Sequence, residues 1–324
     1  MINLTSKPVR LGIVLALLGT AFGMLVYGYQ DEFGYIFDHA DALLTGFLIM
    51  QIFIFAANMI NAVRIRDLIL QDNIATGIMF KAVNLAYGLN ILFPGRASEL
   101  IKPVYFKQTF KLPFDKGLTT VFLEKIFDLI FVLFIALYSL STYHASNAYI
   151  FIILGSLMTL TLTFLKPLET LITDIIRLIP FSLLRSFVSR SFVHTLELRY
   201  HPKFIKVLIT TLAAWVISIA QYYFFINYVG SINLTLGQII TVFTLTTIGG
   251  VVAVLPAGIG TYEAAFVISA GIYGYEFSEA LIIGILLHLS TILQPLLISI
   301  FILTTERSGI SNLLSEIKIK LDKR

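Results

Sequence analysis

The sequence predicts an all-α polytopic membrane protein, both from its composition and from the length of its apolar runs. Of the 324 residues, 57% are hydrophobic and 13% are charged, and the mean hydropathy is +0.88. Soluble globular domains carry roughly twice that share of charged residues. Several uncharged runs reach the roughly 20 apolar residues that a spanning helix needs. We therefore expect one integral membrane domain over residues 1–324, with helices as its spanning elements.

Charge and cysteine content argue against several other classes of protein. The net charge is +4 and the pI is near 9.1, but the basic residues are spread over short loops and the C-terminal tail. Such residues indicate membrane topology rather than a nucleic-acid surface. The chain has no cysteine, and its five histidines lie far apart in sequence. We expect no nucleic-acid partner, no metal and no cofactor, and without a nucleotide-binding loop we expect no direct use of ATP.

The N-terminal region predicts a spanning helix followed by an outer loop. Lys7 and Arg10 precede an uncharged run over residues 11–30, which is long enough to span and lacks the small-x-small cleavage site of a signal peptide. Residues 28–41 then hold four carboxylates and no Lys or Arg. This pattern is typical of a non-cytoplasmic loop, so the first helix should start in the cytoplasm.

A second helix is predicted over residues 42–63. At its end, Asn58, Asn61 and Arg64 are spaced three residues apart, so their side chains share one face. That face should point at protein or water. Arg64 and Arg66 are expected to mark the cytoplasmic side of the membrane.

The next uncharged core, residues 82–95, has only 14 residues and is too short to span the membrane. It ends in Pro94 and Gly95, which we expect to form a structural turn, and a basic stretch follows. This pattern predicts a re-entrant segment that enters from the cytoplasm and returns to it. The lysines after the turn are Lys102, Lys107, Lys111 and Lys116.

A third helix over residues 117–140 and a fourth that ends at Lys166 are joined by a loop without Lys or Arg. The third helix carries Glu124, Lys125 and Asp128 near its cytoplasmic end. One ion at the bilayer centre costs about 2.5 to 3.5 kcal/mol on insertion scales, so these groups must pair or line a wet cavity. Structural ion pairing and a functional role both remain open for the three side chains.

Residues 167–203 predict an amphipathic cytoplasmic segment rather than a spanning one. Apolar residues from 168 to 179 recur at helical spacing with charged residues opposite, and Pro180 splits the segment in two. We expect it to lie on the anionic inner leaflet, because it and its C-terminal flank are rich in basic residues. These are Arg177, Arg185, Arg190, Arg199, Lys203 and Lys206.

The C-terminal half repeats the earlier order of elements. A fifth helix over residues 204–229 leads to a neutral loop, and the uncharged run after it breaks at Pro256 and resumes over residues 261–275. Two carboxylates follow without a basic residue, so both ends of this broken segment look external. A last helix over residues 278–305 returns to a basic tail.

Together these elements predict about six spanning helices and two Pro/Gly-broken re-entrant segments, with both termini in the cytoplasm. Every predicted outer stretch lacks Lys and Arg, as the positive-inside rule requires. The expected location is the cell inner membrane. The two halves, about 42–141 and 204–305, contain the same elements entered from opposite sides, which predicts an inverted repeat.

The spacing of ionisable residues supports this repeat. Glu99 precedes Glu124 by 25 residues, and Glu263 precedes His288 by 25 residues. Each break is therefore followed, at the same distance, by an ionisable residue on the next helix. Inverted repeats with broken helices place substrates near the bilayer midplane, where the N-termini of half-helices supply positive potential.

Three motifs occur in order along the chain: Pro94-Gly95-Arg96-x-x-Glu99, Glu124-Lys125-x-x-Asp128 and Pro256-x-Gly258-x-Gly260-x-x-Glu263. They resemble the recurring motifs of the lysylphosphatidylglycerol synthase transmembrane (flippase-like) family. The resemblance covers about residues 43–303. It implies a membrane protein that moves polar-headed lipids between leaflets.

The chain differs from the family pattern in its domain content and at two residues. The family takes its name from a soluble aminoacyl transferase that is fused after the membrane part in some members. The chain ends at Arg324 without such a domain, so we do not expect synthase activity. Ser98 stands where the family usually has Gly, and His288 stands where it usually has Arg. The second departure bears on the charge preference for the substrate.

The motifs and the charge pattern give one set of candidate substrate-binding residues. Glu99 is either a ligand or a salt-bridge partner of a neighbouring cation such as Lys102. Glu263 is either a ligand or a capping carboxylate in the first turn of a half-helix with Thr261 as its N-cap. His288 either titrates near neutral pH or is a hydrogen-bonded packing residue. The full set is Arg96, Glu99, Lys102, Glu124, Lys125, Asp128, Gly258, Gly260, Glu263 and His288, with structural turns at Pro94, Gly95 and Pro256.

The leading functional hypothesis is a lipid translocase. A polar headgroup would enter a central cavity between the halves, where its phosphate would meet Arg96, Lys102 and His288 and exchange with Glu99 and Glu263. Acyl or isoprenyl chains would stay in the bilayer. Phospholipid, aminoacyl-phospholipid and polyprenyl-phosphate-linked sugars are all candidate cargoes.

Two other classes of function stay open. One is an intramembrane enzyme that modifies lipid headgroups, with Glu124 and Asp128 as acid and base or as metal ligands. The other is a scaffold for a separate cytoplasmic transferase, which would dock on residues 168–200. We expect a transporter rather than an enzyme.

Overall fold

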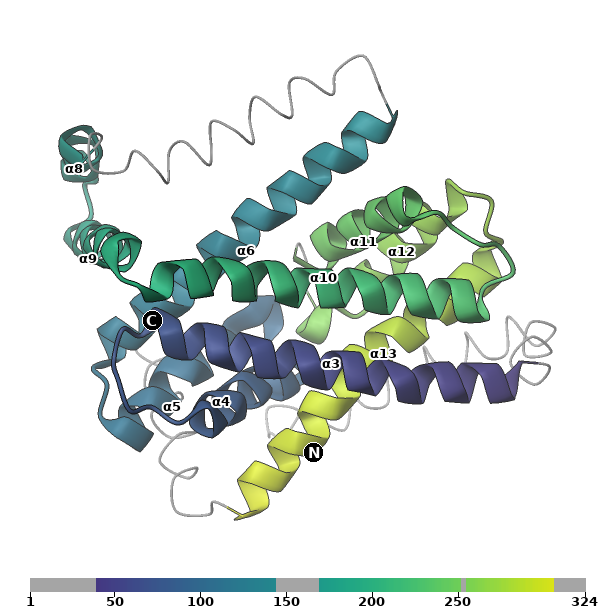
Figure 1. Cartoon of the computed structure of the whole chain (residues 1–324), viewed down its shortest axis with the longest axis horizontal. Helices are drawn as coiled ribbons and strands as arrows, with labels where there is room; N and C mark the ends of the chain where they lie inside the picture. The colour runs from purple at the N-terminus through teal and green to yellow at the C-terminus, as the bar shows by residue number, and fades with distance from the viewer. Residues whose placement is uncertain (1–38, 144–168, 252–254, 306–324) are drawn as a thin grey trace, which may run out of the picture.

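The computed structural model describes residues 39–143, 169–251 and 255–305 (Figure 1). Within these ranges all regular secondary structure is helical, which confirms the predicted all-α class. The first predicted helix, over residues 11–30, and the fourth, which ends at Lys166, lie outside the described residues.

Three of the described helices are long and apolar enough to cross a membrane: α3 (Ala40–Leu68), α10 (Lys203–Val229) and α13 (Phe277–Thr305). They correspond to the second, fifth and last predicted helices. The predicted third helix is α6 (Phe114–Tyr143), whose first half carries several ions. The chain is therefore a multi-pass membrane protein.

Helix α3 continues past the predicted end at residue 63. The side chain of Arg64 is buried within the protein, as expected for a polar face that points at protein. Asp67, one turn further on, is also buried and pairs with Arg66. The helix continues because protein partners, rather than water, satisfy its charged side chains.

The first break in the chain lies where the sequence predicts it. Helix α4 (Thr76–Gly88) passes into the short 3₁₀ helices η2 (Leu89–Leu92) and η3 (Pro94–Leu100), and α5 (Ile101–Phe110) follows. Pro94 begins η3, since proline cannot extend an α-helix from within. Lys111, in the left-handed region at φ 62°, ends α5.

The second break has a sharper turn. Helix α11 (Leu236–Val251) precedes η5 (Pro256–Gly258), and α12 (Thr261–Gly271) follows. Gly258 and Gly260 have φ values of 85° and 86°, a region that glycine reaches easily. Ala257 also has a positive φ of 56°, which is uncommon for a residue with a Cβ.

The N-cap of α12 is Gly260, so the prediction that Thr261 caps this helix is wrong. Thr261 is the first helical residue, and its hydroxyl donates back to the carbonyl of Gly258 at 3.0 Å. The cap position requires a backbone conformation that glycine adopts without strain. Glu263 does lie in the first turn, as predicted.

The segment expected to be amphipathic forms α8 (Glu169–Arg177) and α9 (Ser182–Tyr200), with the split at Pro180. Both helices lie at one end of the bundle, beyond the start of α10 (Figure 1). Several large apolar side chains here are exposed, among them Leu171, Ile175, Leu178 and Phe181.

The helices from the two halves of the chain pack against one another. Helix α3 runs along α10, α4 packs on α13, and α11 packs on α6. The two breaks also meet, because η2 and η3 both contact η5. The α4–α13 contact is close at Gly88, where a Cβ atom would collide with the backbone of Pro295 and the hydroxyl of Ser299. The fold therefore brings both Pro/Gly turns to one place.

Candidate functional site

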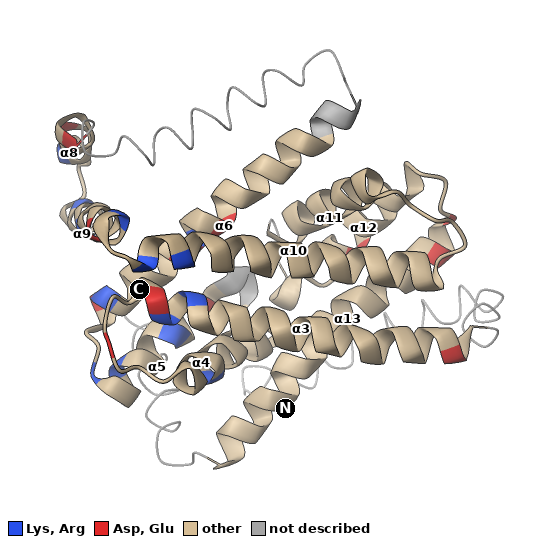
Figure 2. Ribbon diagram, in the orientation of Figure 1, with Lys and Arg blue, Asp and Glu red and all other residues tan. Residues whose placement is uncertain are grey.

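The described Lys and Arg residues gather at one end of the bundle, where α3 ends and α10 begins (Figure 2). None occurs after Lys206 in the described ranges, so α11, α12 and α13 contain no Lys or Arg. Some of these cations are exposed, but three of them turn inward beside the first break.

Lys102, in the first turn of α5, is the most deeply buried of these cations. Its Nζ donates to Oε2 and Oε1 of Glu124 at 2.8 and 3.1 Å and lies 2.8 Å from Oε2 of Glu99. The ring of Tyr87 lies on another side of it, with its centroid 5.1 Å from Nζ. Lys102 and Glu124 are both 0% exposed. A buried ammonium group requires such partners, because the cost of removing it from water is large.

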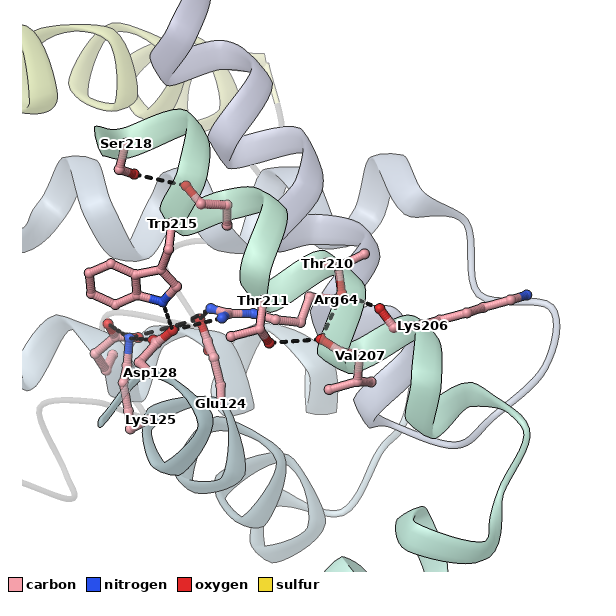
Figure 3. Close-up of polar contacts among 12 residues, drawn as sticks. Arg64, Glu124, Lys125, Asp128, Lys206, Val207, Thr210, Thr211, Trp215 and Ser218 are labelled. Atoms are coloured by element: carbon pink, nitrogen blue, oxygen red, sulfur yellow. Dashed lines mark hydrogen bonds and ion pairs between the residues drawn. The ribbon is translucent and has the colours of Figure 1, made fainter. Parts of the chain in front are cut away.

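Arg64 reaches the same group from α3. Its Nη1 donates to Oδ1 of Asp128 at 2.7 Å, and its Nη2 donates to Oε1 of Glu124 at 3.2 Å. Trp215 on α10 donates its indole N–H to Oδ1 of Asp128 at 3.1 Å. Figure 3 shows the guanidinium and the indole approaching Asp128 from separate helices. Helices α3, α6 and α10 are thereby joined through one carboxylate.

Lys125 is the outermost of the three inward-facing cations. Its Nζ lies 2.7 Å from Oε1 of Glu99 and 3.8 Å from oxygens of both Glu124 and Asp128. Its side chain is 31% exposed, and those of Asp128 and Glu99 are 20% and 18% exposed. The accessible edge of the group therefore consists of one cation and two anions.

We call these six residues the ion cluster. It contains three cations and three anions, so its formal charge is zero: Arg64, Lys102 and Lys125 against Glu99, Glu124 and Asp128. Exposure rises from 0% at Lys102 to 31% at Lys125. Because the charges of the cluster balance, a ligand could replace one of the accessible side chains as a partner. The buried ions would then keep their own partners.

A second polar group, which we call the turn site, is built on η5, α12 and α13. Glu263 accepts a hydrogen bond from the amide of Gly260 at 2.7 Å through Oε2, and its Oε1 lies 2.7 Å from Nδ1 of His288. The other ring nitrogen of His288, Nε2, lies 3.1 Å from the carbonyl oxygen of Ala257. The carboxylate thus caps α12 and pairs with α13 at the same time.

Two tyrosines enclose the turn site. The ring of Tyr262 stacks on the imidazole of His288 with centroids 4.1 Å apart and planes 17° apart. The hydroxyl of Tyr262 meets that of Tyr222 on α10. The turn site therefore connects α12, α13 and α10 as well as the turn itself.

The two sites lie at neighbouring breaks but are separate networks. Among the side chains that the structure describes, no hydrogen bond or ion pair joins Glu99 to Glu263. Arg96 lies on η3, and its side chain lies outside the description. Gly258 and Gly260 shape the second turn by their backbone conformation. The candidate residues therefore form two groups rather than one.

A family model described as the lysylphosphatidylglycerol synthase TM region matches residues 9–299. The chain belongs to this family. The match spans both breaks, the ion cluster and the turn site, and it confirms the resemblance that the three motifs suggested. A comparison with curated proteins found no match, and a comparison with solved structures found none either.

Membership of the lysylphosphatidylglycerol synthase TM region family supports a lipid-related role in the membrane. Two residues that the sequence did not mark as candidates, Arg64 and Trp215, contribute contacts to the ion cluster. The spacing of Arg64 with Asn58 and Asn61 predicts a polar face. Asn58 does donate to Asn84 across α3 and α4, at 3.2 Å. No signal in the sequence singled out Trp215 as a partner of Asp128.

Proposed function

We propose that the chain translocates a polar-headed lipid between membrane leaflets. The observation that carries this proposal is the ion cluster, which places a neutral set of paired charges beside two packed helix breaks, with Lys125, Glu99 and Asp128 at its accessible edge. Ionisable groups inside a membrane protein usually mark a substrate path. Family membership supports a lipid as the substrate.

The graded exposure of the cluster suggests which cation meets the headgroup. Lys102 is enclosed by Glu99, Glu124 and the ring of Tyr87, whereas Lys125 is partly exposed. A lipid phosphate would replace Glu99 as the partner of Lys125, and Glu99 would keep Lys102. During this exchange Lys102, Lys125 and Glu99 each keep a partner of opposite charge. The apolar chains of the lipid would remain in the bilayer while the headgroup passes between the two breaks.

The pairing of helices supports an inverted repeat in which both breaks are re-entrant. Helix α4 packs on α13 as α11 packs on α6, and α5 packs on α6 as α12 packs on α13. Helix α3 meets its counterpart α10, and the first break meets the second. Exchanging the two halves therefore reproduces the same set of neighbours. Repeats of this kind place the substrate at the interface between the halves.

The distribution of charge supports a cytoplasmic location for the basic end of the bundle. The described Lys and Arg residues gather where α3 ends and α10 begins, and α3 starts at its other end with Asp41 (Figure 2). By the positive-inside rule this arrangement supports a cytoplasmic location for the end of α3 and the start of α10. Our proposal includes both termini in the cytoplasm and the inner membrane as the location.

We favour a transporter over a headgroup-modifying enzyme because the two candidate catalytic carboxylates are already engaged. Glu124 accepts hydrogen bonds from Lys102 and Arg64, and Asp128 accepts from Arg64 and Trp215. A general acid or base needs to face its substrate within hydrogen-bonding distance. Proton transfer by either carboxylate would require these internal bonds to break first.

Lipid movement in reconstituted vesicles tests the proposal. Wild-type protein should move a fluorescent phosphatidylglycerol, an aminoacyl-phosphatidylglycerol or a polyprenyl-phosphate-linked sugar between the two leaflets. Glu99→Gln, Glu263→Gln and Lys125→Gln should each reduce the initial rate at least about tenfold, the effect of roughly 1.4 kcal/mol in the transition state. Lys116→Gln is the matched control, because Lys116 is exposed on the same helix as Lys125.

Two results would contradict the proposal. Unchanged rates in both Glu99→Gln and Lys125→Gln would remove the proposed site. Vesicles in which wild-type protein moves none of the three lipids, while remaining folded, would remove translocation itself.

The exposed apolar face of α8 favours one second function, a dock for a separate cytoplasmic transferase. Leu171 and Ile175 on α8, and Leu178 directly after it, are all more than half exposed, beside the exposed ion pair of Arg177 and Asp174. Such a face is also what an amphipathic helix on a membrane surface presents. Co-purification of a transferase that is lost in Leu171→Ser/Ile175→Ser, with lipid binding of the helix unchanged, would favour the dock.

A further inference from the structure

His288 in the turn site faces a hydrogen-bond acceptor on each of its two ring nitrogens. Nδ1 lies 2.7 Å from a carboxylate oxygen of Glu263, and Nε2 lies 3.1 Å from the carbonyl oxygen of Ala257. A neutral imidazole has one N–H donor and one acceptor nitrogen, whereas the imidazolium has two donors. With the Glu263 carboxylate ionised, which its hydrogen bond from the Gly260 amide favours, only the protonated ring satisfies both contacts at once.

We propose that His288 is a proton-binding site that holds the second break closed, and that release of its proton opens this break during lipid transport. The role of His288 in transport rests on the proposed function, whereas the binding of a proton by His288 does not. The ligand of His288 is a proton, and His288 takes no part in the proposed exchange at Lys125.

The groups around His288 offer partners for a protonated ring. Glu263 and Tyr262 face the ring from α12, and the stacked ring of Tyr262 favours a cation over its face. Tyr222 of α10 reaches the ring through Tyr262. Helices α3 and α4 and the short η2 also pack against α13, and η2 contains no ionisable residue. The described side-chain contacts of α3 and α4 with α13 involve neutral groups: Gln51 with Gln294, Met50 with Ser290 and Asn84 with Ser299.

Loss of one proton changes a single hydrogen bond. The N–H at Nδ1 stays with Glu263, because a carboxylate is a stronger acceptor than a peptide carbonyl. The proton on Nε2 leaves to water, and the lone pair left behind faces the carbonyl oxygen of Ala257. Two acceptors 3.1 Å apart without a hydrogen between them repel each other. The ring and the turn should then separate.

The backbone of residues 256–260 can change conformation once the hydrogen bond between His288 and Ala257 is lost. Ala257 is held at a φ of 56°, which is strained for a residue with a Cβ, and the glycines at 258 and 260 allow large changes in dihedral angle. Because η5 packs against η2 and η3, a shift of the turn reaches the first break and the edge of the ion cluster. Proton release at His288 would thereby change access to Lys125.

Two measurements on the full-length chain in lipid nanodiscs test proton binding without transport. The first is ¹⁵N nuclear magnetic resonance of labelled histidine between pH 5.5 and 9, with His288→Gln used for assignment. Both ring nitrogens of His288 should give protonated signals at pH 5.5 and neutral-ring signals at pH 9. A neutral ring at every pH, or a ring that never titrates, would overturn the proposal.

The second measurement is hydrogen exchange of residues 255–263, corrected for the intrinsic effect of pH. Wild-type exchange should rise at least about tenfold as His288 loses its proton. His288→Arg keeps a permanent cation and should stay protected at every pH, whereas His288→Gln should exchange fast at every pH. His194→Gln is the matched control, since His194 also contacts a backbone carbonyl, that of Leu68 at 2.8 Å, but on α9. Exchange that is independent of pH in the wild type would contradict the mechanism.

The role in transport is separable from the proposed function itself. The rate of lipid movement by wild-type protein should change at least fivefold between pH 5.5 and 8.5. The rate for His288→Arg should change less than twofold over the same range. If wild-type protein moves no lipid but His288 titrates and controls exchange, the proposed function fails and the proton site stands. If lipid moves at a rate independent of pH, the role of the proton in transport fails and translocation stands.

Discussion

The ammonium nitrogen of Lys102 lies 2.8 Å from Oε2 of Glu124, and neither side chain is exposed. Glu124 also accepts from Arg64, and Lys102 also contacts Glu99, so the pair forms the interior of the ion cluster. Removing one member leaves an uncompensated charge where water does not reach. Breaking such a pair costs more than replacing both members with neutral groups.

Lys102→Met should therefore reduce the free energy of unfolding by about 3 to 5 kcal/mol. Lys102→Met/Glu124→Gln should recover part of this loss, because it returns the cluster to zero formal charge. Unfolding in mixed detergent micelles measures both values. Lys107→Met, at an exposed position of the same helix, is the control. A double variant no more stable than Lys102→Met would contradict this account.

Trp215 is the only tryptophan in the chain, so its emission reports directly on its contact with Asp128. Asp128→Asn retains an oxygen acceptor for the indole N–H, whereas Asp128→Ala removes it. The emission spectrum should change more in the alanine variant than in the asparagine variant. A hydrogen bond to a charged group contributes about 1.5 to 3 kcal/mol, so Trp215→Phe should reduce stability by a similar amount. Identical spectra for the two Asp128 variants would show that the indole does not sense this acceptor.

Gly88 permits the close contact between α4 and α13. A Cβ atom there would collide with the carbonyl of Pro295, a backbone group that cannot rotate away. Gly88→Ala should reduce the free energy of unfolding by about 1 to 3 kcal/mol, as overpacking usually does. Gly77 lies in the same helix with nothing within 4 Å of an added Cβ, so Gly77→Ala should be neutral or slightly stabilising. Equal melting temperatures for the two variants would refute the contact.

Asp72, in the loop between α3 and α4, supports a pH-dependent contact at the basic end of the bundle. The hydrogen bond from Lys203 Nζ, at 3.0 Å, lowers the pKa of the Asp72 carboxyl below its usual value. The contact should therefore be present above the unfolded pKa of about 3.9 and be lost as the pH falls through the lowered value. Since Asp72 is exposed, the effect on global stability should be small.

Local hydrogen exchange is the appropriate measurement for this contact. At pH 7, Asp72→Asn should exchange faster than wild type over residues 69–75. At a pH below the lowered pKa of Asp72, the two proteins should be indistinguishable. A difference that persists at such a pH would assign the effect to something other than the charge.

The ends of helices were predictable from the sequence where a single residue, such as a proline, decides them. Pro94 and Pro256 mark the two breaks because proline cannot continue a helix, and Pro180 separates α8 from α9 for the same reason. The end of α3 was not predictable in this way. Its last turns carry Arg64 and Asp67, which are both buried. Arg64 pairs with carboxylates of α6, and Asp67 pairs with Arg66 of the same helix.

Most residues of the ion cluster and the turn site were candidates from the sequence, but Arg64 and the pairing of the charges were not predictable. The cost of an ion in a membrane requires Glu124, Lys125 and Asp128 to have partners, but it does not name them. Within α6, Lys125 lies 3.8 Å from Asp128, whereas Arg64 from α3 reaches it at 2.7 Å. The link between Glu263 and His288 was signalled only as a spacing of 25 residues, which the fold converts into a hydrogen bond.

The contact between α4 and α13 also constrains how the protein is made. The hydroxyl of Ser299 donates to the carbonyl of Asn84 at 2.8 Å, although the two residues are 215 positions apart in the chain. At about 5 to 20 residues per second, a ribosome needs roughly 10 to 40 s to supply the second partner after the first. During this interval α4 and the first break have no α13 to cover them. We therefore expect the insertion machinery to shelter this hairpin during the interval, and a chain truncated before α13 to be a substrate for membrane quality control.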